Sequence, residues 1–333
     1  MPARIPVRRH LPIVAGCFLL MMAAVLAAPF IGSTPIQVGR VFSRAVPFAE
    51  NVDAQIFFIA RLPRALAAAL VGGTLAAAGV VFQGLLRNPL ATPYTLGVSA
   101  GASLGAMIAI TFGEAWLVGG VASASLAGAL LAVAVVYALA NAHHHGMSTT
   151  VLLLAGVTLN AFFSALILFV QYLSDFAQTF RALRWLMGDL DVASYSPLVA
   201  ALPLVAVAFG AFIWLARPLN LLSMGSEAAA SRGIDVMRAQ RVAFFAASLA
   251  TGAAVSVGGP IGFVGIIVPH FVRLVVGADH RLVLPASTFF GAAFLVGCDA
   301  IARTILSPLE LPVGIITAMI GGPFFLWLLI RKR

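Results

Sequence analysis

The most constraining feature of this chain is the uncharged run between Arg64 and Arg87, which consists mainly of Ala, Leu, Val and Gly. About 20 apolar residues in a helix cross a hydrocarbon core of about 30 Å, so this run is long enough to span a membrane. Comparable runs recur along the sequence, and 62% of its residues are hydrophobic and 9% charged. A soluble domain has about a quarter of its residues charged. The chain is therefore expected to be a membrane protein with many spans.

The next apolar segment contains three glycines spaced four residues apart, Gly97, Gly101 and Gly105. In a helix, residues at this spacing lie on one face, and glycines leave that face without side chains. Another helix can then approach backbone to backbone, as in small-residue packing of transmembrane helices. We therefore interpret the three glycines as helix-packing residues.

The full pattern predicts an all-α polytopic protein in which residues 1–333 form one transmembrane domain. About ten spans are expected, and the eighth is the weakest because Pro269, His270 and Arg273 lie near its end. An even number of spans places both termini on the same side. The expected spans are 11–31, 62–85, 95–112, 115–140, 149–173, 194–216, 237–258, 263–276, 282–304 and 312–330.

Basic residues predict the orientation. Short cytoplasmic loops of membrane proteins are enriched in Lys and Arg. With both termini inside, one set of bases lies inside and a smaller set outside, so an N-in, C-in arrangement is favoured. The inner set is Arg4, Arg8, Arg9, Arg87, Arg217, Arg232, Arg238, Arg241, Arg273, Arg281, Arg331, Lys332 and Arg333, and the outer set is Arg40, Arg44, Arg61, Arg64, Arg181, Arg184 and Arg303. The net charge of +9 is thus attributed to membrane orientation, and no nucleic-acid partner is expected.

Motifs for chemistry within the chain are missing from the sequence. It contains no GxxxxGK[ST] loop, its only lysine is Lys332, and it has neither HExxH nor CxxC. We expect no catalytic site, metal site or cofactor, so any ATP and Mg²⁺ would bind a separate ATPase. The consecutive histidines 143–145 are interpreted as a solvated basic loop, with incidental metal or haem contact as the alternative.

Three separated segments carry a family resemblance: RLPR at 61–64, GLLRNPLA at 84–91 and LGVSAGA at 96–102. They resemble FecCD-type permease subunits of type II ABC importers for iron–siderophore, haem or cobalamin, and the likeness covers roughly residues 55–333. It implies a homodimer in the bacterial inner (cytoplasmic) membrane with two ATPase subunits and a periplasmic substrate-binding protein. A ferric siderophore is the expected cargo, with cobalamin or haem as alternatives. An ion-coupled secondary transporter is the rival function.

Residues 217–241 form the longest connection on the expected cytoplasmic face. The run at 227–230 favours a short helix, and a following glycine is a common helix stop. The resemblance implies that this coupling loop docks on the ATPase; a solvated connector is the alternative. The implied contact residues are Glu227, Ala228, Arg232, Gly233 and Asp235.

The resemblance also implies that Arg61, Arg64 and Arg303 bind acidic side chains of the binding protein at the outer face. Anchoring to lipid phosphates is the alternative. Asp299, four residues before Arg303, is expected to pair with it on one helix face. A proton-coupled carrier would need other titratable groups within its spans.

Three amide side chains are candidates for a translocation path: Gln83, Asn160 and Gln171. A buried amide in a membrane helix must form hydrogen bonds, most often with a neighbouring helix. That structural role is the favoured reading, and contact with cargo is the alternative.

Overall fold

The structure is a computed structural model that describes residues 11–43, 46–113, 119–141, 149–191 and 194–331. These residues form helices and connections without a strand, which confirms the all-α prediction. Residues 143–145, for which a basic loop was predicted, lie outside the described residues. The longer helices are α1 (Leu11–Ala27), α4 (Leu62–Leu86), α5 (Val98–Phe112), α6 (Gly120–Asn141), α7 (Thr149–Tyr172), α8 (Phe176–Leu186), α9 (Ser196–Leu222), α11 (Val236–Gly258), α12 (Val264–Val276), α13 (His280–Ala302) and α14 (Val313–Arg331).

Each of the ten expected spans coincides with a helix. Within the described residues, seven helical segments are long and apolar enough to cross a membrane, and α5, α12 and α14 supply three shorter apolar helices. At about 1.5 Å per residue, the 13 residues of α12 extend only about 20 Å. This short length agrees with the weakness of the eighth span in the sequence.

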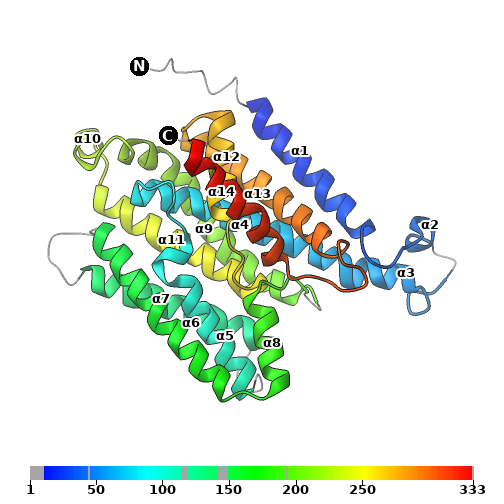
Figure 1. Ribbon diagram of the computed structural model, residues 1–333. Helices are drawn as coiled ribbons and strands as arrows, with labels where there is room; N and C mark the ends of the chain where they lie inside the picture. Colours follow the sequence, from blue (N-terminus) through cyan, green and yellow to red (C-terminus); the bar gives the residue numbers. More distant parts are fainter. Residues whose placement is uncertain (1–10, 44–45, 114–118, 142–148, 192–193, 332–333) are drawn as a thin grey trace.

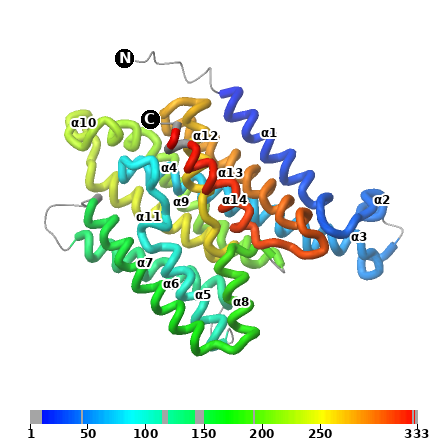
Figure 2. Tube along the Cα trace, viewed as in Figure 1, coloured from blue at the N-terminus to red at the C-terminus, as the bar shows by residue number. Residues whose placement is uncertain are grey.

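Helix α4 lies in the middle of the bundle, between α13, α11, α12 and α9 (Figures 1 and 2). Nearly all of its residues from Val71 to Leu86 are buried. A Cβ atom on Gly72 would overlap the carbonyl oxygen of Gly291 in α13, and one on Gly79 would overlap that of Gly265 in α12. The central helix therefore meets two neighbours backbone to backbone.

Helices α5 and α6 pack in the same way. A Cβ on Gly101 would lie 2.5 Å from the Gly128 carbonyl oxygen, and one on Gly105 would overlap that of Ala124. Gly97 differs because it precedes α5 with a φ of +79°, a left-handed conformation that favours glycine. The glycine-rich face of α5 thus uses α6 as its partner.

The stretches 32–60 and 174–193, which lie between the expected spans, contain helices. Residues 32–60 include α2 (Val38–Val41), α3 (Val52–Gln55) and a π-helical segment, η3 (Ile56–Arg61), that continues into α4. Residues 174–193 contain α8, which begins at a capping box between Asp175 and Gln178. Its mixed polar and apolar composition hid α8 from a search for apolar runs.

The start of α1, the end of α14 and the short helix α10 (Ser226–Ala230) lie toward the top of Figure 1. Helices α3 and α8 lie toward the right and the bottom of that view. This arrangement agrees with an even number of spans. The N-in, C-in orientation remains a prediction.

We expect Gly105→Ala to destabilise the protein, because the added methyl group would force α5 away from α6, and overpacking costs about 1–3 kcal/mol. The matched control is Gly210→Ala in α9, where a Cβ would meet nothing within 4 Å. Alanine is the better helix former by about 1 kcal/mol, so the control should be neutral or stabilising. Thermal unfolding in detergent measures both, and equal midpoints would contradict this packing account.

Candidate functional site

A cluster of five charged side chains lies at the α3/α8 end of the bundle, and we call it the outer charge cluster: Arg61, Arg64, Asp299, Arg303 and Glu310. Arg64 Nε lies 2.8 Å from Asp299 Oδ1, and its Nη1 lies 2.5 Å from Glu310 Oε2. Arg303 Nε lies 3.0 Å from Asp299 Oδ2, which confirms the predicted i,i+4 pair. One buried aspartate thus joins α4 to the end of α13.

The same arginines bind the connection that follows α1. Arg61 donates hydrogen bonds to the Pro29 and Thr34 carbonyl oxygens at 3.3 and 2.5 Å. Arg303 donates to the Ile31 carbonyl oxygen at 2.9 Å. The outer charge cluster therefore holds α1, α4 and α13 together.

Burial of the three arginines is the main departure from the sequence-based prediction, which placed them in contact with a partner. Arg61 is 7% exposed, Arg64 8% and Arg303 2%. A buried guanidinium requires an opposite charge or acceptors, and this chain supplies both. Glu310 is the exposed member, with 41% of its side chain accessible. Docking by these arginines remains a prediction.

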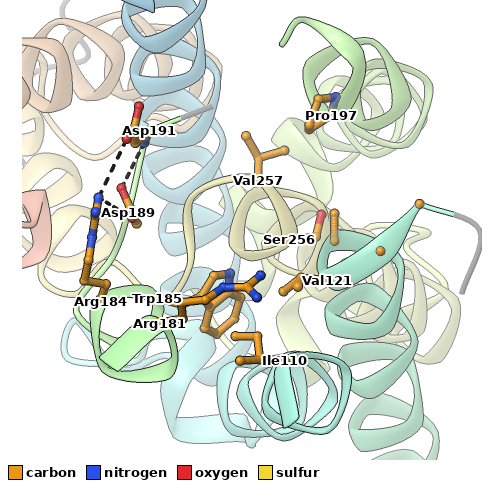
Figure 3. Close-up of a pocket in the computed structure, with 13 residues that line it drawn as sticks. Ile110, Val121, Arg181, Arg184, Trp185, Asp189, Asp191, Pro197, Ser256 and Val257 are labelled. Carbon is orange, nitrogen blue, oxygen red and sulfur yellow. Dashed lines mark hydrogen bonds and ion pairs between the residues drawn. The ribbon is translucent and has the colours of Figure 1, made fainter. Parts of the chain in front are cut away.

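Two cavities flank the end of α8. The first has a volume of about 610 Å³ and is lined by the ends of α5, α8 and α11 and the beginnings of α6 and α9. Figure 3 shows the Arg181 side chain pointing into it, beside Trp185 and opposite Val121 and Ser256. The second has a volume of about 540 Å³ and is lined by Arg64 and Glu310 among others. Both volumes fall in the range of small-molecule sites, about 300–1,000 Å³.

A second set of charges separates these cavities. Arg184 Nη2 lies 2.9 Å from Asp189 Oδ2 and 3.7 Å from Asp191 Oδ2 (Figure 3). All three residues line both cavities. The sequence analysis counted Arg184 among the outer bases but named none of the three as a site residue, although the capping box of α8 could have revealed the helix that carries Arg184.

Beneath the cavities, the chain between α11 and α12 leaves the helical conformation at Gly259–Phe263. The Tyr94 hydroxyl donates to the Ile261 carbonyl oxygen. A Cβ on Gly259 would lie 2.5 Å from the Trp185 carbonyl oxygen. The segment around Tyr94, the segment 259–263 and the end of α8 thus meet inside the bundle. Irregular backbone at membrane depth is stable only where protein or a water-filled cavity surrounds it.

The amide candidates for a path have structural contacts. Gln83 donates to the Gly265 carbonyl oxygen at 3.0 Å and accepts from Arg273, which joins α4 to α12. Asn160 donates to the Tyr94 carbonyl oxygen at 2.7 Å. Gln171 is half-buried near the end of α7. None of the three lines the two outer cavities, so a role in the path remains a prediction.

The coupling loop lies at the opposite end of the bundle, where α10 connects α9 to α11. Four of its five candidate residues, Glu227, Arg232, Gly233 and Asp235, are exposed, and Ala228 is half-buried. Gly233 ends the turn after α10 with a φ of +79°. Asp235 caps α11 by accepting from the Arg238 backbone N–H at 2.9 Å.

The loop is anchored from beneath. Ala229 of α10 is fully buried in the core, and the Arg87 guanidinium at the end of α4 donates to the Ser226 hydroxyl. Because these contacts attach the exposed helix α10 to the bundle, a movement of α10 would also move α4 and α9. Among the described residues, no group of three or more His, Cys, Asp and Glu side chains could hold a metal ion.

We expect Asp299→Asn to destabilise the protein by about 3–5 kcal/mol, because it leaves Arg64 and Arg303 buried without their shared counter-charge. Glu310→Gln removes a half-exposed partner and should cost about 0–1 kcal/mol. Thermal unfolding of the two variants in detergent compares them. Similar midpoints would show that Asp299 does not hold the outer charge cluster together.

Comparison with known proteins agrees with this architecture. The profile of the FecCD transport family matches residues 19–331. The chain is 47% identical to the cobalamin import permease BtuC of Halobacterium salinarum, over 81% of this chain and 72% of the relative. It is 38% identical to the hemin transport permease HmuU of Yersinia pestis, over 95% of each.

A solved structure agrees as well. The structure of an inward-facing metal-chelate type ABC transporter superposes with a TM-score of 0.84 at 31% identity, covering 97% of this chain and 99% of that one. In ABC importers, such permeases work with a separate ATPase and a substrate-binding protein. The chain belongs to the FecCD transport family and is a multi-span permease subunit of an ABC importer in the inner membrane.

Proposed function

We propose that two copies of this chain form the translocation unit of an importer for a metal chelate, driven by two ATPase subunits at α10 and supplied by a binding protein at the α8 end. The main support for this proposal is that the coupling loop and the two outer cavities are both accessible and lie at opposite ends of the bundle. The exposed coupling loop lies at one end of the bundle, and two cavities of about 610 and 540 Å³ lie at the other.

The position of α4 supports a pathway between copies. This helix fills the centre of the chain, and its residues from Val71 to Leu86 are buried. Its glycine contacts leave no space for a bulky ligand between α4 and α12 or between α4 and α13. A route along the face that contains α5, α8 and the end of α11, where the larger cavity opens, avoids this obstacle.

The proposed cargo is a corrinoid or haem. The named transporters among the relatives above import cobalamin or hemin, which favours a macrocyclic chelate over the ferric siderophore expected from sequence. The siderophore remains the alternative. The Trp185 side chain at the larger cavity offers an aromatic surface to a flat ligand.

Ion coupling receives less support. Among the described helices long enough to span a membrane, α13 contains the acid to consider as a proton-binding site, Asp299. It lies within 3.0 Å of two guanidinium groups, and each of its carboxylate oxygens forms an ion pair with one of them. Asp299 therefore fits a structural role better than proton relay.

Docking of the binding protein is proposed to proceed by exchange. Arg64 already pairs with the half-exposed Glu310, so an incoming carboxylate would replace Glu310 while Asp299 keeps its contact. Replacing Arg61 or Arg64 directly would disturb the buried cluster and confuse docking with folding. Glu310 is the better residue to test.

We expect Glu227→Arg to abolish ligand-stimulated ATP hydrolysis in the reconstituted complex, because it reverses an exposed charge on α10. Glu50→Arg is the matched control, since Glu50 is exposed on the connection before α3. Gly233→Leu should also uncouple the complex because leucine strains the left-handed conformation, whereas Gly233→Asn should retain more activity. Normal stimulation in Glu227→Arg would refute the coupling role.

Glu310→Gln should speed association with the binding protein several-fold at low salt, because Arg64 no longer has a competing carboxylate. Asp191→Asn is the control, as it removes an exposed acid from the neighbouring set. Surface plasmon resonance over a salt series gives both rates. An association rate equal to that of the control would show that Arg64 serves structure alone.

A further inference from the structure

An apolar groove runs along the bundle between α9 and α13. Two cavities of about 530 and 390 Å³ form it. They are continuous because Phe209, Thr288 and Phe289 line both. The cavity of about 530 Å³ lies toward the α8 end, and we call it the upper cavity; residues of α1, α4, α9 and α13 line it. The cavity of about 390 Å³ lies toward the α10 end, and we call it the lower cavity; residues of α9 and α13 line it.

The walls of the groove are apolar over most of its length. On α9, lining residues extend from Leu198 to Ala216, a distance of about 27 Å at about 1.5 Å per residue. This is close to the thickness of the hydrocarbon core, about 30 Å. Ile213 lines the lower cavity and is 79% exposed. The groove is therefore open to the acyl chains of the bilayer.

The two ends of the groove differ in charge. At the α8 end, the lining includes Tyr195, whose hydroxyl donates to the Phe58 carbonyl oxygen at 2.7 Å. At the α10 end, Arg281 lines the lower cavity and is exposed. Arg217, also exposed, follows Ile213 by four residues and so lies on the same face of α9. Arg217 and Arg281 thus both lie toward the α10 end of the apolar groove.

One acid lies near this basic end, and its contacts are internal. Asp279 Oδ1 accepts from Asn220 Nδ2 at 2.6 Å and from the Arg281 backbone N–H at 3.0 Å. His280 also lines the lower cavity and is buried, with its Nδ1 2.7 Å from Asn220 Oδ1. Asp279 thus caps the start of α13, while the Arg281 side chain points to the surface.

We propose that this groove binds an anionic phospholipid from the leaflet on the α10 side. Its phosphate lies between Arg217 and Arg281, and one acyl chain occupies the lower cavity against Phe212, Leu284 and Phe289. Basic pockets between transmembrane helices on the cytoplasmic side bind anionic lipid head groups. Because α9 leads directly into α10, the bound lipid stabilises the helix that carries the coupling loop.

The test is native mass spectrometry of the purified permease, titrated with phosphatidylglycerol or with phosphatidylcholine of the same acyl chains. The wild type should bind phosphatidylglycerol several-fold more tightly. Arg217→Gln with Arg281→Gln should lower that preference to less than about two-fold. Arg241→Gln, at an exposed arginine that lines neither cavity, should leave the preference unchanged.

A second variant tests the acyl site independently. Ile213→Trp should fill the lower cavity and remove one bound lipid of either class. Val207→Trp, at a position on α9 that is 66% exposed and lines neither cavity, is its control. Equal affinity of the wild type for the two lipids would overturn the proposal, as would full lipid binding by Ile213→Trp. A change of oligomeric state in Ile213→Trp, seen by light scattering, would assign the groove to a protein partner instead.

Discussion

The rest of the structure depends on the contact of the α4 backbone with α13 and α12. At Gly72 the partner is Gly291, and at Gly79 it is Gly265. Since the hydrophobic effect does not drive association between helices in lipid, close packing and polar contacts have to do so. Small residues allow close packing here because the helix backbones can approach each other. They also allow polar contacts, because the charged groups at the helix ends then lie close together. A side chain at Gly72, Gly79 or Gly291 would separate helices that carry functional groups.

The polar ends of this central pair explain how one chain can serve two partners. At the α8 end, Arg64 of α4 and Asp299 of α13 lie 2.8 Å apart at the centre of the outer charge cluster. At the other end, Arg87 follows α4 and donates to Ser226 in the coupling loop. Helix α4 is thus joined to α13 by an ion pair at one end and by glycine packing in the middle, and to the coupling loop at its other end. Alternating access is then expected to proceed by rigid-body motion between copies, or at the irregular segments beside α8 and α12, a common way for such transitions to occur.

Sequence reasoning succeeded where the signal is local or long and repetitive. Ten apolar runs predicted ten helices, and the four-residue spacing of Asp299 and Arg303 predicted their pair. It failed where distant segments meet. Arg64 and Glu310 are 246 residues apart in the chain. Nothing in the sequence therefore indicates that Glu310 pairs with the Arg64 guanidinium, which was expected to bind a partner. It also missed α8, because a short amphipathic helix lacks the long apolar run used to find spans.

The central claim is that this chain opens a path for a metal chelate when a separate ATPase acts on its coupling loop. The most direct measurement is uptake into proteoliposomes that contain this chain and its ATPase, with the binding protein and cyanocobalamin, haemin or a ferric siderophore supplied outside. The account predicts that a corrinoid or haem accumulates only with ATP inside and all three proteins present. Accumulation driven by a proton or sodium gradient without the ATPase would contradict it.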